Sequence, residues 1–139
     1  MEDYSFSTEV RVRFAETDAQ GVVNNAVYLV WFEIARIDYL AEFGGGYPAL
    51  RAQGIEAFVS EANVRYGAPV RFDDRLRIHT RCGDIRGARF RFDYLIERDG
   101  ETVAEGWTRH ACVNGETLRP TRVPEWLVDA IRRGEGEAS

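Results

Sequence analysis

The 139-residue chain contains no lysine, only two histidines and two cysteines, and no long apolar run. All 18 basic residues are therefore arginines, which fits a genome-wide composition bias or, as a sharper alternative, selection for bidentate phosphate contacts. Cys82 and Cys112 are far apart and have no CxxC spacing, so we expect two reduced thiols and no metal site. No stretch approaches the ~20 apolar residues of a transmembrane helix, and the first residues do not resemble a signal peptide. We therefore expect a cytoplasmic protein with no membrane partner and no bound metal.

Motifs that identify several enzyme classes are also missing. The sequence contains no GxSxG elbow, no Walker loop, no GxGxxG turn and no HExxH or Cys/His metal cluster. The two histidines fall on different predicted strands. We expect His79 to face solvent and His110 to have a hydrogen-bonded structural role, so a serine–histidine triad has little support. The net charge of −5 is dispersed along the chain, which argues against a nucleic-acid partner.

Hydrophobic periodicity divides the first third of the chain into one strand and one long helix. Apolar residues alternate with arginines from Val10 to Phe14, which is typical of a half-buried strand. From Asn24 to Phe43 they recur at three- and four-residue steps on so many sides that the helix should be enclosed by other elements. Asn24 is expected to cap this helix, and the three glycines at 44–46 are expected to end it.

The rest of the chain is predicted to form strands joined by short turns. Alternation of apolar and polar residues places them near residues 58–66, 75–82, 89–96 and 102–113. Asp99-Gly100 is a strong hairpin signal, and Pro124 should start a short C-terminal helix. This order favours an antiparallel sheet with the long helix on one face, so the predicted fold class is α+β. We expect a single domain over residues 1–133 and a disordered tail over residues 134–139.

The polar segment between the first strand and the helix has the residues best suited to chemistry. It places Asp18 in a loop directly before a helix N-terminus, where free backbone N–H groups and a partial positive charge can stabilise an oxyanion. A carboxylate near a thioester carbonyl can act as a nucleophile or as a general base for water. Gly21 permits a tight turn and close approach of a ligand. Taken alone, the arrangement also fits a turn or capping role for Asp18.

The detailed sequence narrows that choice. Residues 13–28 read RFAETDAQGVVNNAVY, residues 31–36 read WFEIAR, and a later segment, residues 66–76, reads YGAPVRFDDRL. These segments resemble the 4-hydroxybenzoyl-CoA thioesterase family of hotdog proteins. The resemblance covers residues 8–115, essentially the whole domain, and it agrees with the order of elements predicted from periodicity.

The resemblance implies a hotdog fold, in which a curved five-stranded antiparallel sheet wraps a long central helix. It also implies dimers that often pair into tetramers, with active sites at the subunit interface and no cofactor. Asp18 stands at the position of the family's catalytic carboxylate. The backbone N–H of Asn25 stands where it would face the thioester carbonyl, and Gly21 holds the turn between them.

Tyr28 and Glu33 are the candidate substrate-binding residues. Glu33 falls where some family members have an acid that meets a polar group on the acyl part, although an ion pair with Arg36 at i,i+3 is the favoured alternative. Four arginines are candidates for contacts with the phosphates of CoA: Arg65, Arg71, Arg86 and Arg89.

The function that this resemblance implies is hydrolysis of acyl-CoA thioesters to the free acid and CoA by a homo-oligomer, either a dimer or a tetramer. Two alternatives stay open: an acyl-carrier-protein thioesterase, and a non-catalytic hotdog protein that binds acyl thioesters. Many bacterial members have histidine where this chain has Asn25. That difference leaves a backbone N–H available but leaves the acyl preference open. Hotdog hydratases have histidine where Val23 stands, which disfavours hydratase activity.

Overall fold

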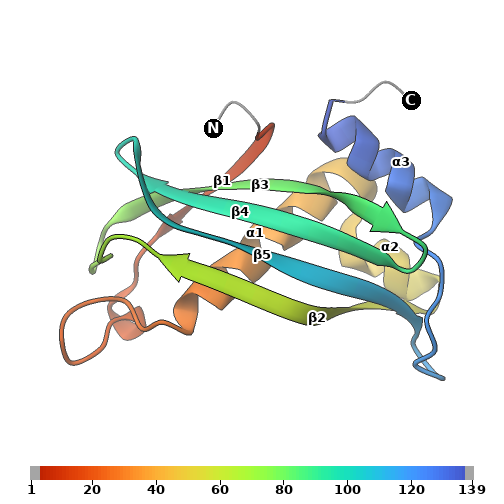
Figure 1. The fold of residues 1–139 in the computed structure, drawn as a ribbon, viewed down its shortest axis with the longest axis horizontal. Helices are drawn as coiled ribbons and strands as arrows, with labels where there is room; N and C mark the ends of the chain where they lie inside the picture. The colour runs from red at the N-terminus through yellow and green to blue at the C-terminus, as the bar shows by residue number, and fades with distance from the viewer. Residues whose placement is uncertain (1–3, 137–139) are drawn as a thin grey trace.

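The computed structural model of the chain describes residues 4–136. Figure 1 shows a curved sheet with a long helix across one face and two shorter helices at one end. In chain order the elements are β1 (Phe6–Arg11), the short 3₁₀ helix η1 (Phe14–Glu16), α1 (Val27–Gly44), α2 (Gly46–Ala52), β2 (Ile55–Tyr66), β3 (Arg75–Arg86), β4 (Arg89–Arg98), β5 (Glu101–Asn114) and α3 (Glu125–Gly134).

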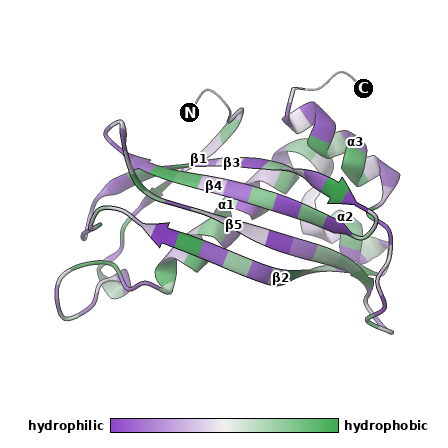
Figure 2. Cartoon of the chain, viewed as in Figure 1, coloured by the Kyte–Doolittle hydropathy of each residue, from purple (hydrophilic) through white to green (hydrophobic). Residues whose placement is uncertain are grey.

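All neighbouring strands of the five-stranded sheet are antiparallel, in the order β1-β3-β4-β5-β2. Figure 2 shows the alternation of hydrophilic and hydrophobic residues along the strands. The predicted α+β class and the predicted antiparallel sheet around a long helix are confirmed. The expected turn at Asp99-Gly100 is also present. It joins β4 to β5, and both residues have positive φ, 52° and 82°, as a two-residue type I′ hairpin requires.

The core forms where the inner face of α1 meets the inner face of the sheet. Phe32 stacks on Tyr94 with the ring centroids 4.1 Å apart, and Tyr39 meets Phe92 edge to face at 5.5 Å. All four side chains are at most 1% exposed. Because burial of one such side chain contributes about 2–3 kcal/mol, these contacts hold the helix firmly on the sheet.

Gly106 on β5 permits this close packing. A Cβ at this position would lie 2.2 Å from the backbone oxygen of Asn63 and 2.8 Å from Cε2 of Phe32. Neither neighbour can move easily, since Asn63 belongs to the adjacent strand β2 and Phe32 is fully buried in the core. The ring of Phe32 can therefore reach the sheet only where β5 has no side chain.

Two predicted boundaries near the first helix are wrong. The helix begins at Val27 and not at Asn24, because Asn24 initiates a turn: its Oδ1 accepts a hydrogen bond from the N–H of Ala26 at 2.9 Å. The first strand ends at Arg11. Phe14 begins η1 with its side chain exposed, because a 3₁₀ turn replaces the predicted continuation of the strand.

Contacts between the C-terminal segment and the core continue further along the chain than expected. Gly134 is the last residue of α3 and is buried, and a carboxylate oxygen of Glu135 accepts hydrogen bonds from the Tyr39 hydroxyl and the Cys82 N–H. The expectation of disorder is therefore wrong for residues 134–136, which the structure describes. Its last three residues, 137–139, lie outside the described residues.

The sequence predicted that other elements enclose the helix α1. In the single chain one face of α1 is instead open to solvent. Its outer face exposes apolar side chains that are each 39–49% accessible: Leu29, Val30, Ile34 and Ile37. The neighbouring strand β2 is an edge of the sheet and adds Phe58 and Val59, which are similarly exposed.

The packing at Gly106 predicts a large destabilisation by one methyl group. Gly106→Ala forces β2 and Phe32 away from β5, and we expect it to lower the free energy of unfolding by about 3 kcal/mol in urea titrations. Gly83→Ala on β3 is the matched control. Nothing lies within 4 Å of a Cβ at Gly83, so stability should stay the same or rise by up to about 1 kcal/mol. Equal effects of the two substitutions would contradict this account of the core.

Candidate active site

The loop that precedes α1 is a small hairpin, and it lies at the opposite end of the molecule from α2 and α3 (Figure 1). Thr17 and Val23 form an antiparallel bridge across it. The N–H of Asp18 donates to the Val22 oxygen at 2.8 Å, and the N–H of Gly21 donates to the Asp18 oxygen at 3.0 Å. Gly21 has φ of 79°, a conformation that glycine adopts without strain. The predicted tight turn is therefore present, with Asp18 at its start.

Backbone hydrogen bonds hold this hairpin to the body of the protein. The N–H of Val23 donates to the oxygen of Val70 at 2.8 Å, and Val22 bridges Arg71 in the segment between β2 and β3. Val23 and Val70 are both buried. The return side of the hairpin therefore holds the whole hairpin in place, although Asp18 itself is exposed.

Glu16 holds the loop to the helix and was not singled out from the sequence. Its carboxylate is 6% exposed and accepts hydrogen bonds from the backbone N–H of Arg13 at 2.7 Å and from the indole Nε1 of Trp31 at 3.1 Å. Its backbone oxygen accepts from Asn24 at 2.9 Å. A sequence signal existed, because a buried tryptophan needs an acceptor for its N–H.

The carboxylate of Asp18 is available for chemistry. One oxygen, Oδ1, accepts the N–H of Gln20 at 2.8 Å and so stabilises the turn. Among the described residues the other oxygen has no donor. The turn role and the chemical role considered for Asp18 are thus compatible, because they use different oxygens of one exposed carboxylate.

The first turn before α1 presents a backbone donor close to this loop. The oxygen of Asn25 accepts the Tyr66 hydroxyl at 2.9 Å, which fixes the orientation of the turn against β2. Within the part of the chain that the structure describes, the N–H of Asn25 has no acceptor. Tyr28 follows in the helix, is 3% exposed, and packs edge to face on Trp31 and Tyr66. Its predicted contact with substrate stays a prediction, and in the single chain its ring belongs to the core.

A groove of about 220 Å³ runs between α1 and β2, beginning in the first turn of the helix. It is mainly apolar, and Glu33 and Arg36 are its two charged residues: it is lined by Leu29, Val30, Glu33, Arg36, Val59, Ala62 and Thr108. Glu33 is exposed and its Oε2 lies 3.8 Å from Nη2 of the buried Arg36, so the predicted i,i+3 pair is present but loose.

A buried polar network lies beneath this groove. Thr108 Oγ1 hydrogen-bonds the Tyr94 hydroxyl at 2.7 Å and His110 Nε2 at 2.8 Å, which confirms a hydrogen-bonded structural role for His110. Burial and then the charge of Arg36 lower the pKa of His110 to about 3, so its ring is neutral at pH 7. Burial acts to lower the pKa of Arg36, but interactions with Tyr94 and Tyr47 outweigh it and raise that pKa.

The four arginines proposed for phosphate contacts differ in their surroundings. Arg65 pairs with Glu105 and Arg86 pairs with Asp84. Arg71 and Arg89 have no ion pair among the described residues. Of these two, Arg71 lies beside the loop, with its Nη1 4.0 Å from the position of a Cβ on Gly21. Arg71 is therefore the candidate closest to the loop.

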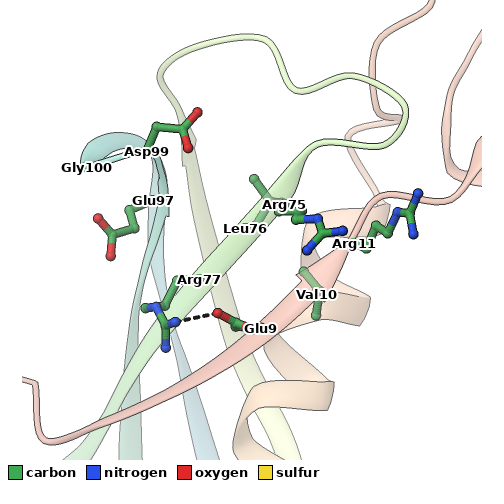
Figure 3. A pocket seen from close by; sticks show the side chains of 9 residues that line it. All are labelled: Glu9, Val10, Arg11, Arg75, Leu76, Arg77, Glu97, Asp99 and Gly100. Atoms are coloured by element: carbon green, nitrogen blue, oxygen red, sulfur yellow. Dashed lines mark hydrogen bonds and ion pairs between the residues drawn. The ribbon is translucent and has the colours of Figure 1, made fainter.

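A larger groove of about 590 Å³ lies elsewhere, along β1, β3 and the turn between β4 and β5 (Figure 3). Acidic and basic side chains line it together, and two of them, Arg77 and Glu9, pair across it. None of the predicted site residues lines this groove. His79 lies nearby on β3, and the expectation that it faces solvent is wrong: its side chain is 12% exposed and hydrogen-bonds Glu97 at 2.7 Å.

Neither a metal cluster nor a membrane span is found in residues 4–136. No three His, Cys, Asp or Glu side chains there are grouped so that they could hold a metal ion. No helix in the same range is long and apolar enough to cross a bilayer.

Comparisons with known proteins point to one superfamily. A family model described as the thioesterase-like superfamily matches residues 12–131. The acyl-CoA thioester hydrolase YbgC of Escherichia coli is 32% identical and covers 92% of this chain and 96% of its own length. The 1,4-dihydroxy-2-naphthoyl-CoA hydrolase of Synechococcus elongatus is 33% identical over 95% of this chain and 97% of its own length.

A solved structure agrees with the fold. The thioesterase of Thermus thermophilus, crystallised with coenzyme A and zinc, superposes with a TM-score of 0.84 at 29% identity over all of both chains. Together with the family match, this likeness confirms the hotdog architecture that the sequence resemblance implied.

The buried carboxylate of Glu16 predicts a specific loss of order. In Glu16→Gln the amide retains one acceptor oxygen but sets an NH₂ group against the donor of the other oxygen, either the Arg13 N–H or the Trp31 indole. We expect unfolding to become easier by about 1–3 kcal/mol and the amides of residues 18–24 to exchange faster with solvent. Glu61→Gln, which removes half of an exposed pair with Arg109, should change stability by no more than about 0.5 kcal/mol. Unchanged exchange in the loop of Glu16→Gln would refute the anchoring role.

Proposed function

Because the chain belongs to the thioesterase-like superfamily, we propose that it is an acyl-CoA thioesterase, which hydrolyses acyl-CoA to the free acid and CoA. The observation that carries the proposal is a juxtaposition in the fold. Asp18, an exposed carboxylate with one unpaired oxygen, stands on a fixed hairpin. The turn that leads from this hairpin into α1 contains Asn25, whose N–H has no acceptor among the described residues. The narrower assignment to the 4-hydroxybenzoyl-CoA thioesterases stays a prediction.

The proposed chemistry uses the helix start as the oxyanion site. The N–H of Asn25, together with the partial positive charge of the helix N-terminus, stabilises the oxygen of the thioester carbonyl as it becomes negative. Asp18 acts in one of two ways. As a nucleophile, it attacks the carbonyl carbon and expels CoA thiolate, leaving an acyl–aspartyl anhydride that water then cleaves. As a general base, it takes a proton from a water molecule that attacks the carbon directly, and that proton later neutralises the departing thiolate.

The other site residues have supporting roles in this proposal. Gly21 keeps the hairpin tight and leaves space for the thioester, and Glu33 contacts the acyl group at the rim of the groove between α1 and β2. Arg71 is the arginine that we assign to the CoA phosphates, because its guanidinium lies beside the loop and pairs with no acid among the described residues. Arg71 suits this role, since a guanidinium can bind phosphate through two parallel hydrogen bonds.

We also propose that the working form is a homo-oligomer built on a dimer. The 12 residues of β2 form an edge strand, which is a ready template for pairing with another strand. Beside it, Val30, Ile34 and Ile37 recur at helical spacing on the exposed face of α1. A second copy seated on β2 and α1 would bury both features and close the open side of the groove. Whether two such dimers then pair into a tetramer stays a prediction.

Thiol release from acyl thioesters tests the proposed activity. The wild-type protein should liberate CoA from a panel of aliphatic and aromatic acyl-CoA substrates, and faster than it liberates thiol from the same acyl groups on a carrier protein. Asp18→Asn keeps the shape and removes the charge, so kcat should fall by about 10²–10⁴-fold with KM little changed. Glu33→Gln should stay within about tenfold of wild type on a plain aliphatic substrate.

The controls separate loss of chemistry from loss of fold. Asp129→Asn removes an exposed carboxylate on α3, far from the loop, and should turn over as wild type does. A folded, oligomeric Asp18→Asn protein with near-full turnover would refute the role of Asp18. Preference for the carrier-bound substrate would favour the carrier-protein alternative, and tight binding without turnover would favour the non-catalytic one.

The proposed dimer predicts a change in mass when the apolar face is charged. Ile34→Glu puts a carboxylate in the middle of the exposed stripe, so light scattering should show a monomer at concentrations where wild type is oligomeric. Leu118→Glu, a change at an apolar residue outside the stripe that is 59% exposed against 39% for Ile34, should leave the mass unchanged. A wild-type protein that is monomeric at every micromolar concentration would rule the dimer out.

A further inference from the structure

The groove between α1 and β2 contains one buried cation whose hydrogen-bonding capacity is not filled. Arg36 is 8% exposed and lines the groove, and its Nε has no hydrogen-bond partner. A guanidinium has five N–H donors. Interactions with Tyr94 and Tyr47 raise the pKa of Arg36, but Glu33 at 3.8 Å is beyond hydrogen-bond distance. A buried charge with too few partners is costly, so this one requires an explanation.

Arg36 is the polar donor that the groove offers to a ligand. The hydroxyl of Thr108 is already bonded to Tyr94 and His110, and the remaining lining residues apart from Glu33 are apolar. Helical side chains lean toward the N-terminus of the helix, so the guanidinium of Arg36 lies near the level of Glu33. At 1.5 Å per residue this level is on the order of 10 Å from the start of the helix, where the proposed oxyanion site lies.

We propose that Arg36 selects acyl groups that bear a neutral oxygen acceptor, a hydroxyl or a carbonyl, at the end remote from the thioester. This inference rests on the proposed function, because it takes the groove as the acyl site of a thioesterase. With the thioester held at the helix start, the acyl group extends along the apolar groove and ends at the guanidinium. The remote oxygen then accepts from the Nη side of the guanidinium, which faces Glu33, because the unpaired Nε is itself buried.

The carboxylate of Glu33 argues against an anionic acyl end. It lies 3.8 Å from Nη2 of the same guanidinium, so a second carboxylate would share one cation with it and meet its repulsion. A hydroxyl has no such conflict, because it can accept from Arg36 and donate to Glu33. A plain methyl end would leave the donors of Arg36 unmatched.

Binding of non-hydrolysable thioether analogues of acyl-CoA tests this assignment by calorimetry. In the matched set an eight-carbon acyl chain ends in a methyl, a hydroxyl or a carboxylate: octanoyl, 8-hydroxyoctanoyl and octanedioyl. Wild type should bind the hydroxyl-ended analogue at least about tenfold more tightly than the methyl-ended one, as a hydrogen bond to a charged group allows. In Arg36→Met the ratio should fall to about one. Arg109→Met, on the outer face of β5, should retain the wild-type ratio.

Glu33→Gln keeps the test decisive if Arg36→Met does not fold, because Glu33 is exposed. It removes the competing carboxylate, so the affinity for the octanedioyl analogue relative to the octanoyl analogue should rise about tenfold. Equal binding of methyl- and hydroxyl-ended analogues by wild type would overturn the proposal. So would a preserved preference in folded Arg36→Met, or no gain for octanedioyl in Glu33→Gln. Absence of thiol release from every acyl-CoA would sink the proposed function instead, and the binding ratios would still report on the groove.

Discussion

The hydrogen bond from the Trp31 indole to the buried carboxylate of Glu16 ties the candidate loop to the central helix. One carboxylate thereby satisfies the polar atom of the largest side chain in the core and the backbone of the segment that leads into the loop. The hairpin with Asp18 follows two residues later and has little freedom of its own. The helix that packs the core thus also fixes the position of the candidate catalytic group. The contact between Trp31 and Glu16 therefore contributes both to stability and to the geometry of the site.

The same helix also has an apolar face that the single chain leaves uncovered. One face of α1 is buried on the sheet through Phe32 and Tyr39, while the opposite face exposes Val30, Ile34 and Ile37 to solvent. The unpaired edge of β2 lies beside that face. Such an exposed apolar surface next to a free strand edge is a marker of protein association. In our proposal, assembly and acyl binding occur on one surface, which links oligomeric state to activity.

Much of the fold could be predicted from the sequence because its signals are local. Two-residue alternation located the strands, and Asp99-Gly100 located a hairpin that its positive φ values explain. The start of α1 was misplaced because Asn24 can cap a helix or initiate a turn, and the choice depends on contacts made by residue 16 and β2. Asp18 and Gly21 could be proposed as site residues because they belong to a contiguous motif. Glu16 and Arg36 were not, because their roles come from burial and from partners distant in sequence.

The central claim is that the thioester sits where the loop containing Asp18 meets the start of α1. A crystal structure of Asp18→Asn with intact acyl-CoA would test this most directly. Our account predicts the thioester oxygen about 3 Å from the N–H of Asn25. The side chain of residue 18 should be within about 3.5 Å of the carbonyl carbon, or one water molecule away from it. A thioester bound elsewhere, for example in the charged groove along β1 and β3, would contradict the account.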